Sequence, residues 1–217
     1  MSSESYKVIE CPHCHEKFEA KFWSVVRGDI DITIKDLIIN EEFNLLMCPN
    51  CNKIFSYEEN FIYMDPEEEL FVIVMPEYYR NQENVIEKLK SDYISIKNML
   101  SDKKELNMEP EYLFGADKLR EILLDDMNRE EESEVISFIC AEKNYRTKKI
   151  KKNFARKNKL PVVLPYKNTT EKDDILSILD EILNEYPKLT TLKTLAKLLS
   201  KTESARIEFI EDEDKTT

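Results

Sequence analysis

Two short segments constrain the fold of this chain more than any other part of it. Each has the pattern Cys-Pro-x-Cys, with Cys11 and Cys14 in the first segment and Cys48 and Cys51 in the second. Two cysteines separated by two residues can direct both sulfurs at one metal ion, and four thiolates in two such pairs are a ligand set of structural zinc sites. The sequence therefore predicts that the two segments meet around one structural Zn²⁺ ion.

Each of these segments, called knuckles below, requires particular backbone φ values. Proline fixes φ and favours a tight turn between the two cysteines. The residue after the second cysteine must then tolerate a positive φ, and His15 and Asn52, of residue types enriched in that conformation, stand there. The 33 residues between the knuckles exceed the usual spacing of roughly 15–20, so we expect this insert to form structure of its own.

Other readings of the knuckles explain less. A redox Cys-x-x-Cys pair would need a thioredoxin-like βαβ context. A single such pair would suffice, so the redox interpretation leaves the second knuckle unexplained. Disulfides are disfavoured because nothing in the sequence indicates export. A catalytic zinc keeps an open coordination position, which four thiolates would fill. His13 and His15 could replace cysteines as ligands, but four cysteines make them unnecessary, and we expect both to be exposed.

The fifth cysteine, Cys140, lies in an apolar helical run, residues 135–141, and is interpreted as a buried core thiol. A catalytic cysteine would need a histidine partner, and both histidines belong to the first knuckle. No Ser/His/Asp, Cys/His or His-Glu-x-x-His pattern occurs, and with only two glycines, Gly28 and Gly115, the chain has no glycine-rich phosphate loop. We therefore expect a protein that is not an enzyme.

The chain shows neither a secretion signal nor a run of about 18 apolar residues, so we expect a cytoplasmic protein without a membrane span. Its net charge of −12 disfavours nucleic acid as a partner. Residues 143–159, however, hold nine basic side chains and no acidic one. This basic segment is interpreted either as a solvated helix face or as a nucleic-acid contact, aided by stacking of Tyr145 and Phe154 or by a helix-turn-helix of helices 117–128 and 133–143. The candidate nucleic-acid contacts are Arg146, Lys148, Lys149, Lys151, Lys152 and Arg156.

The periodicity predicts an α+β protein: an N-terminal zinc-ribbon-like antiparallel β-module followed by a mostly helical C-terminal region. Phe18, Ala20 and Phe22 alternate with charged residues as in a half-buried strand. The alternation of Ile30, Ile32 and Ile34 either extends that strand or leads into a short helix near residues 35–40. Further strands are expected at 54–57, 61–64 and 70–75, and the first domain is placed at residues 1–78.

From residue 79 to 210 the pattern becomes helical, and residues 211–217 are expected to form a disordered acidic tail. In the helix 82–101, apolar residues from Ile86 to Leu100 recur every three or four positions. This helix is expected to pack on the β-module, and it also offers a surface for homodimerisation. Apolar periodicity predicts two more helices before and after Pro187.

The segment Ile9–Cys14, followed by Phe18–Trp23, resembles the CpXC domain of bacteria and archaea. The second knuckle with Phe55, the turn at Asp65-Pro66 and the strand that ends at Met75-Pro76-Glu77 share this resemblance, which covers roughly residues 5–130. It implies a zinc-ribbon-like module and no particular reaction.

The sequence as a whole therefore points to a zinc-binding, non-enzymatic interaction or regulatory protein that meets protein partners, with nucleic acid as the alternative partner. Four aromatic residues of the β-module could contact such a partner or pack in the core: Trp23, Phe55, Phe61 and Tyr63.

Overall fold

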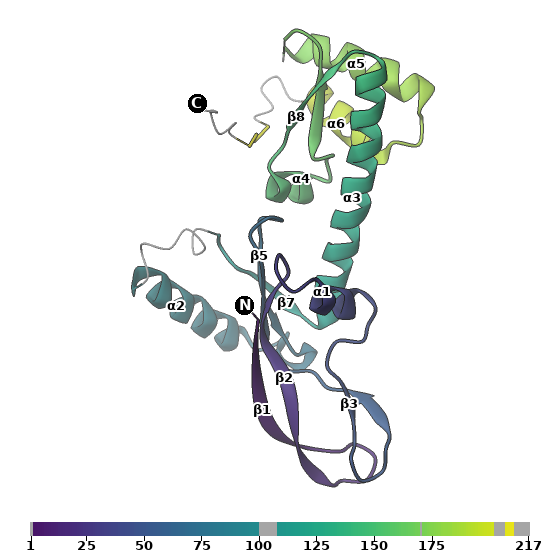
Figure 1. The fold of residues 1–217 in the computed structure, drawn as a ribbon. Helices are drawn as coiled ribbons and strands as arrows, with labels where there is room; N and C mark the ends of the chain where they lie inside the picture. The colour runs from purple at the N-terminus through teal and green to yellow at the C-terminus, as the bar shows by residue number, and fades with distance from the viewer. Residues whose placement is uncertain (1, 100–107, 170, 202–206, 211–217) are drawn as a thin grey trace, which may run out of the picture. The chain divides into compact units, whose positions relative to one another are not determined.

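The computed structural model describes residues 2–99, 108–169, 171–201 and 207–210, and Figure 1 shows its ribbon. The chain divides into two compact units, Met1–Leu123 and Leu124–Thr217. The predicted boundary after residue 78 does not coincide with this division, because a strand and the first turns of a helix beyond that residue belong to the first unit. The predicted acidic tail, residues 211–217, lies outside the described residues.

The first unit is built on a five-stranded sheet with the strand order β1-β2-β5-β6-β7. The strands are β1 (Ser3–Glu10), β2 (Lys17–Arg27), β5 (Phe61–Asp65), β6 (Leu70–Met75) and β7 (Glu111–Phe114). A separate two-stranded ribbon consists of β3 (Leu45–Met47) and β4 (Ile54–Ser56). The predicted α+β class, with an N-terminal sheet and a mostly helical remainder, is confirmed.

The main sheet is mixed, whereas the prediction had only antiparallel pairs. β1 and β2, and likewise β5 and β6, pair antiparallel, but β2 pairs with β5 in parallel and β6 pairs with β7 in parallel. Parallel neighbours need a long crossover connection. The insert between the knuckles and the β3–β4 ribbon supply one crossover, and the chain between β6 and β7, which includes α2 (Glu83–Met99), supplies the other.

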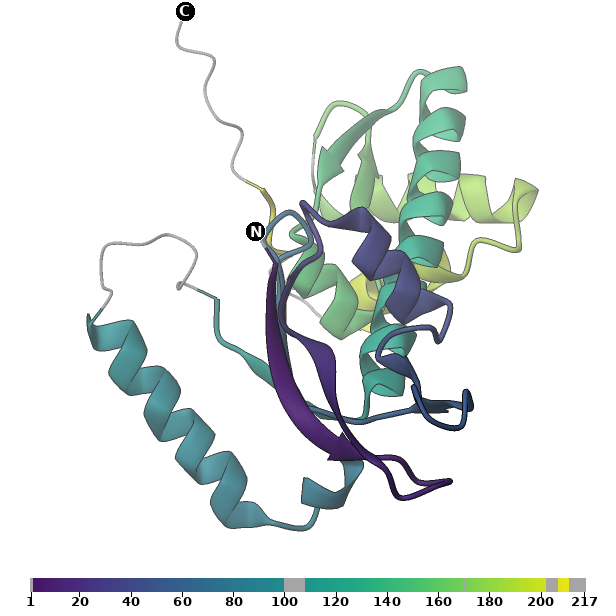
Figure 2. The same ribbon diagram turned by 60° about the horizontal axis from the view of Figure 1, so that its bottom comes forward.

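Helices cover both faces of this sheet. Ile34 and Ile38 on α1 (Ile32–Ile39) share one buried cluster with the side chains of β5 and β6. Leu119 and Leu123, near the start of α3 (Ala116–Glu142), belong to the same cluster. On the other face, the ring of Tyr93 on α2 lies 5.8 Å from that of Phe71. Figures 1 and 2 show α1 and α2 on opposite sides of the strands. The alternating isoleucines thus lead into a short helix and do not extend the strand. Ile34 and Ile38, four residues apart, lie on the buried face of this helix, whereas Ile30 and Ile32 are exposed.

The second unit holds the rest of α3 (Ala116–Glu142), β8 (Arg146–Lys149), α4 (Lys152–Asn158), β9 (Val163–Tyr166), α5 (Lys172–Glu185) and α6 (Thr190–Lys201). One continuous helix, α3, replaces the two helices predicted at 117–128 and 133–143, so the helix-turn-helix interpretation is wrong. The residues between the two predicted helices, Arg129–Glu132, are strong helix formers with neither glycine nor proline, and nothing ends the helix there.

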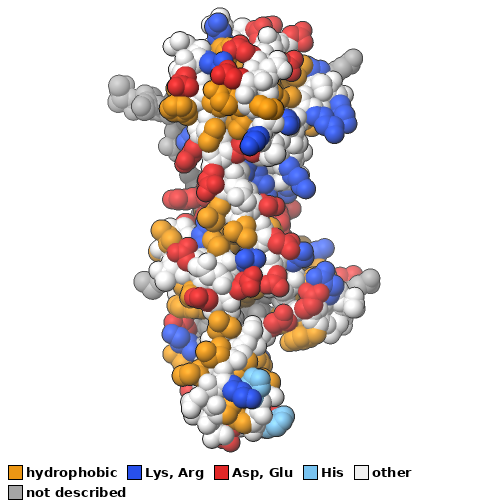
Figure 3. Space-filling model, turned by 90° about the vertical axis from the view of Figure 1, so that its right-hand side faces the viewer, with side chains coloured by type: hydrophobic (Ala, Val, Ile, Leu, Met, Phe, Trp, Pro, Cys, Tyr) orange, Lys and Arg blue, Asp and Glu red, His pale blue; other side chains and the backbone are white. Residues whose placement is uncertain are grey.

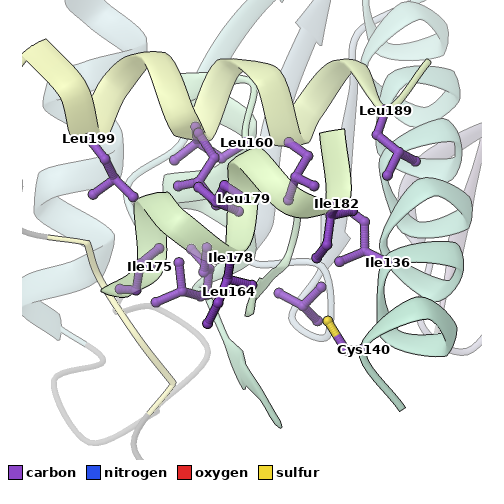
Figure 4. Close-up of a cluster of buried hydrophobic side chains, with 14 of the residues drawn as sticks. Ile136, Cys140, Leu160, Leu164, Ile175, Ile178, Leu179, Ile182, Leu189 and Leu199 are labelled. Carbon is purple, nitrogen blue, oxygen red and sulfur yellow. The ribbon is translucent and has the colours of Figure 1, made fainter. Parts of the chain in front are cut away.

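A single apolar core holds the second unit together (Figure 4). Leu179 and Ile182 of α5, Leu192 and Leu195 of α6 and Ile136 of α3 are all fully buried in it. Cys140 belongs to the same core, as predicted, and burial raises the pKa of its thiol to about 11. None of the helices among the described residues is both long and apolar enough to span a membrane.

Gly28, directly after β2, is required by close packing. Its backbone N–H donates to the carbonyl of Met64 at 2.9 Å, which draws it against β5. A Cβ atom at this position would lie 2.0 Å from Oη of the buried Tyr63 and 2.8 Å from Oδ2 of Asp65. The Tyr63 hydroxyl donates to that same Asp65 oxygen, so it has little freedom to move.

We expect Gly28→Ala to lower the free energy of unfolding by about 2–3 kcal/mol, because the new methyl group overpacks a closed core. Tyr63→Phe alone should cost about 1 kcal/mol for its hydrogen bond. In the double variant, removal of Oη should recover part of the loss, and urea denaturation measures all three. Strictly additive losses would contradict the steric account of Gly28.

Candidate metal centre

The two knuckles have the same backbone geometry. In the first, the N–H of His15 donates to the carbonyl of Cys11 and the N–H of Cys11 to that of Glu16; in the second, Asn52, Cys48 and Lys53 repeat the pattern, all at 2.9–3.0 Å. His15 has φ 61° and Asn52 has φ 56°, so the predicted positive φ after each knuckle is confirmed. These bonds turn the chain sharply and point both cysteines of a knuckle in one direction.

Each knuckle joins the ends of an antiparallel strand pair. The first lies between β1 and β2, next to the last pair Glu10–Lys17, and the second lies between β3 and β4, next to the last pair Met47–Ile54. The strands thus hold each turn at a fixed place. The insert of 33 residues forms β2, α1 and β3, as its length required.

The four sulfurs of the knuckles form one cluster in which all lie within 4.8 Å of one another. Sγ of Cys11 is 3.8 Å from that of Cys51, and Sγ of Cys14 is 3.6 Å from that of Cys48. Four sulfurs bound tetrahedrally about 2.3 Å from a zinc ion would lie about 3.8 Å apart. The thiols are free rather than disulfide-bonded, and the spacing of the cluster fits a metal ion with four thiolate ligands.

The electrostatics of the cluster also favour a cation. A hydrogen bond from the backbone of Glu16 lowers the pKa of Cys14 to about 6, with smaller help from the Asn50 amide, against partial burial. A backbone hydrogen bond from Lys53 favours the Cys51 thiolate, yet burial and the neighbouring thiols raise the pKa of Cys51 to about 11. Thiolates this close repel one another, and a divalent metal ion would supply the positive charge that compensates them.

Hydrogen bonds and a small apolar cluster support the four sulfurs. The N–H of His13 lies 3.4 Å from Sγ of Cys11, and the side-chain amide of Asn50 reaches across to Sγ of Cys14 at 3.7 Å. Beneath the cluster, the buried residues Ile9, Ala20 and Phe22 pack with four partly buried neighbours. Cys11 and Cys48 are fully buried, whereas Cys14 and Cys51 are partly exposed.

The histidines lie outside the metal cluster among the described residues. The ring of His15 is exposed and contacts Glu10 at 2.9 Å, which agrees with the expectation that it is no ligand. Of the four aromatic residues that could meet a partner or pack inside, Phe61 and Tyr63 are buried and Trp23 and Phe55 are half-buried. Core packing therefore accounts for Phe61 and Tyr63, whereas Trp23 and Phe55 are packed on one side and exposed to solvent on the other.

Sequence reasoning missed a set of exposed apolar side chains beside the second knuckle. Leu45, Met47 and Ile54 on the β3–β4 ribbon are 44%, 62% and 64% exposed, and Met47 lies directly opposite Ile54. In Figure 3, exposed hydrophobic side chains lie close to the two histidines of the first knuckle. We call these three residues the ribbon patch. The sequence predicted a strand at 54–57, but only the pairing of β4 with β3 shows which side chains of the ribbon face outward.

The basic segment forms β8 and α4 rather than one helical face, and four of its six candidate contacts already have partners within the second unit. These are Arg156 with Asp126 (2.6 Å), Lys152 with Glu130 (2.5 Å), Lys151 with Glu208 (3.7 Å) and Lys148 over the ring of Phe209 (4.3 Å). Arg146 and Lys149 are exposed. The arrangement gives nucleic-acid binding no support, because acidic side chains already pair with Lys151, Lys152 and Arg156.

Arg156 belongs to a buried ion cluster. Its guanidinium and that of Arg129 both donate to the carboxylate of Asp126, and all three side chains are at most 9% exposed. Two cations share one anion here, so neither partner of Asp126 is a surface charge. A contact that the sequence suggested for nucleic acid is thus a structural element of the second unit.

Comparison with known proteins identifies the first part of the chain. The family model described as CpXC protein matches residues 9–129, which is more than half of the sequence. The match includes both knuckles, the last two residues of β1, the other four strands of the main sheet and the beginning of α3. No curated protein and no solved structure matches the chain significantly.

We expect Arg156→Ala to lower the free energy of unfolding by about 1.5–3 kcal/mol, because it removes charge-assisted hydrogen bonds to the buried Asp126, which Arg129 still partners. Arg146→Ala is the matched control: this arginine is exposed on β8, and its loss should change stability by less than about 0.5 kcal/mol. Urea denaturation of both variants makes the comparison. Equal, small effects would show that Arg156 is not held as described.

Proposed function

Because this chain belongs to the CpXC protein family, we propose that Cys11, Cys14, Cys48 and Cys51 bind one structural zinc ion and that the folded module is a cytoplasmic, non-enzymatic interaction or regulatory domain. The spacing of the four sulfurs is the observation on which this proposal rests. When bound, the ion would supply charge compensation and cross-linking rather than chemistry on a substrate.

The donor set supports a structural role. A metal with four thiolate ligands has no open position for water or substrate, which catalytic zinc sites keep. Structural zinc contributes directly to folding, with apparent binding free energies of about 10 kcal/mol or more. That contribution matters here, because the apolar cluster beneath the knuckles has only three buried residues among those described.

The ribbon patch supports an interaction role for the same module. Its three apolar side chains project from a short ribbon that the second knuckle closes, so the metal would hold the patch in shape. Exposed apolar side chains grouped on a rigid element are typical of surfaces that bind another protein. We therefore propose the outer face of the β3–β4 ribbon as the contact surface for a protein partner.

Metal analysis of the purified protein should find about one zinc per chain. Cys48→Ser should abolish stoichiometric zinc binding and increase amide hydrogen exchange in the first unit far more than in the second, because two ligands of the cluster come from the second knuckle. Cys140→Ala is the matched control: it removes a cysteine from the core of the second unit and should leave the zinc content unchanged. Substoichiometric zinc after growth in zinc-rich medium, or iron in its place, would contradict the proposal.

Ile54→Asp should abolish retention of a protein partner in affinity purification from the native host, because it places a charge in the centre of the ribbon patch. Ile32→Asp serves as the matched control, since Ile32 is equally exposed (65% against 64%) but lies on α1. Both variants should keep their zinc content and circular dichroism spectrum. Partners that bind both variants as they bind the wild type would exclude the ribbon patch as the contact surface.

A further inference from the structure

A small apolar cavity lies in the first unit beside the β3–β4 ribbon. It has a volume of about 130 Å³, and buried side chains form its floor. The rings of Phe43 and Phe61 lie 4.6 Å apart there, and Val74 and Met75, which also line it, are each only 2% exposed. The deep part of this cavity, which we call the ribbon cavity, is therefore apolar.

The mouth of the ribbon cavity is acidic. Glu58, Glu59 and Asp117 line it, and among the described residues no lysine or arginine does. Glu59 pairs with Lys7 at 2.7 Å, but neither Glu58 nor Asp117 has an ion-pair partner in the described part of the chain. Glu58 accepts the backbone N–H of Glu77 at 3.0 Å, and both Glu58 and Asp117 are exposed. Two carboxylates at the mouth thus lack a counter-ion.

The chain next to the ribbon cavity does not supply the missing cation. The undescribed residues 100–107 precede the N-terminal end of β7, whereas the cavity lies past its C-terminal end, at Gly115 and Ala116. The lysine nearest in sequence, Lys118, is already paired with Glu121 at 2.7 Å. The cavity therefore offers its apolar floor and its acidic mouth to a ligand from outside the chain.

The size and charge of the ribbon cavity indicate what fits it. An apolar cavity of about 150 Å³ holds a molecule as small as benzene, and drug-sized ligands need about 300 Å³ or more, so this cavity admits a single side chain. Lysine buries a four-carbon apolar stem and keeps its ammonium group at the polar edge. An acidic side chain would be repelled at the mouth, and an apolar one would leave the carboxylates without a cation.

The ribbon cavity borders the ribbon patch. Ser56, which lines the cavity, lies directly opposite Leu45 of the patch in the pairing of β3 with β4. Asn44, another cavity residue, precedes Leu45, and its carbonyl accepts the N–H of Tyr57 at 3.3 Å. A partner segment that covers Leu45 would therefore place its next side chains at the mouth of the cavity.

We propose that the ribbon cavity takes the side chain of a lysine from the protein partner that binds the ribbon patch. The stem would pack on Phe43 and Phe61, and the ammonium group would face the carboxylates of Glu58 and Asp117. This inference rests on the proposed function, because it names the chemistry of the partner that the same module binds. The partner segment would combine an apolar residue for the ribbon patch with a lysine for the cavity.

The first test titrates the full chain with Nα-acetyl-lysine N-methylamide and follows the backbone amide signals by two-dimensional NMR. Saturable shifts at Tyr57, Gly115 and Ala116 are expected, because these residues line the cavity. The norleucine analogue keeps the stem but lacks the ammonium group, so it should bind at least about tenfold more weakly. The arginine analogue, with its broad planar guanidinium, should also bind more weakly. Absence of saturable shifts, equal binding of norleucine or tighter binding of arginine would overturn the proposal.

Variants at the mouth and in the lining locate the binding. Asp117→Asn removes one charge from the mouth and should weaken binding of the lysine analogue about fivefold. Asp173→Asn is the matched control, because Asp173 is an exposed aspartate in the first turn of α5, as Asp117 is in that of α3. Ala116→Leu should fill the cavity and abolish binding. Equal effects of the two aspartate variants would overturn the proposal even if Ala116→Leu disturbs the fold.

Affinity purification from the native host separates this inference from the proposed function. Asp117→Asn should reduce retention of the same partner that Ile54→Asp loses. If Ile54→Asp retains every partner, the ribbon patch is excluded, and binding of the lysine analogue that depends on Asp117 still supports a lysine site. If Ile54→Asp loses a partner that Asp117→Asn retains in full, the ribbon patch stands and the assignment of the partner's lysine to the cavity is overturned.

Discussion

The convergence of four cysteine sulfurs is the interaction on which the knuckle end of the first unit depends. The knuckles join β1 to β2 and β3 to β4, and the apolar cluster beneath them has three buried residues, Ile9, Ala20 and Phe22. A core this small stabilises little by itself, because stability grows with the apolar surface buried. A metal ion that cross-links the two turns would therefore hold the β3–β4 ribbon to the sheet and keep the ribbon patch in a fixed shape.

In the second unit, many charged side chains surround one apolar core. Asp126 holds two arginines in a buried ion cluster, and acidic partners neutralise Lys151 and Lys152. Within a stretch that reads as uniformly basic along the chain, Lys143, Lys151, Lys152 and Arg156 thus have acidic partners in space.

Sequence reasoning succeeded where a local rule determines the structure. The knuckles, the positive φ of His15 and Asn52 and the burial of Cys140 follow from residue types and short spacings, and the structure confirms each. Prediction from the sequence failed where the structure depends on which distant segments pair with each other. Nothing local distinguishes a parallel from an antiparallel partner for β2. The break that was expected between helices 117–128 and 133–143 is absent, because residues 129–132 favour a helix as strongly as their neighbours do.

By itself, the sequence indicated which four cysteines form the candidate metal centre and the class of the fold, because cysteine spacing, proline and hydrophobic periodicity act over a few residues. Only the tertiary structure decided that the four sulfurs lie within 4.8 Å of one another and that the ribbon patch faces outward. It alone also decided that Arg156 is buried while Arg146 is exposed. The reason is that burial and charge compensation depend on residues far apart in the chain, whose meeting no local pattern specifies.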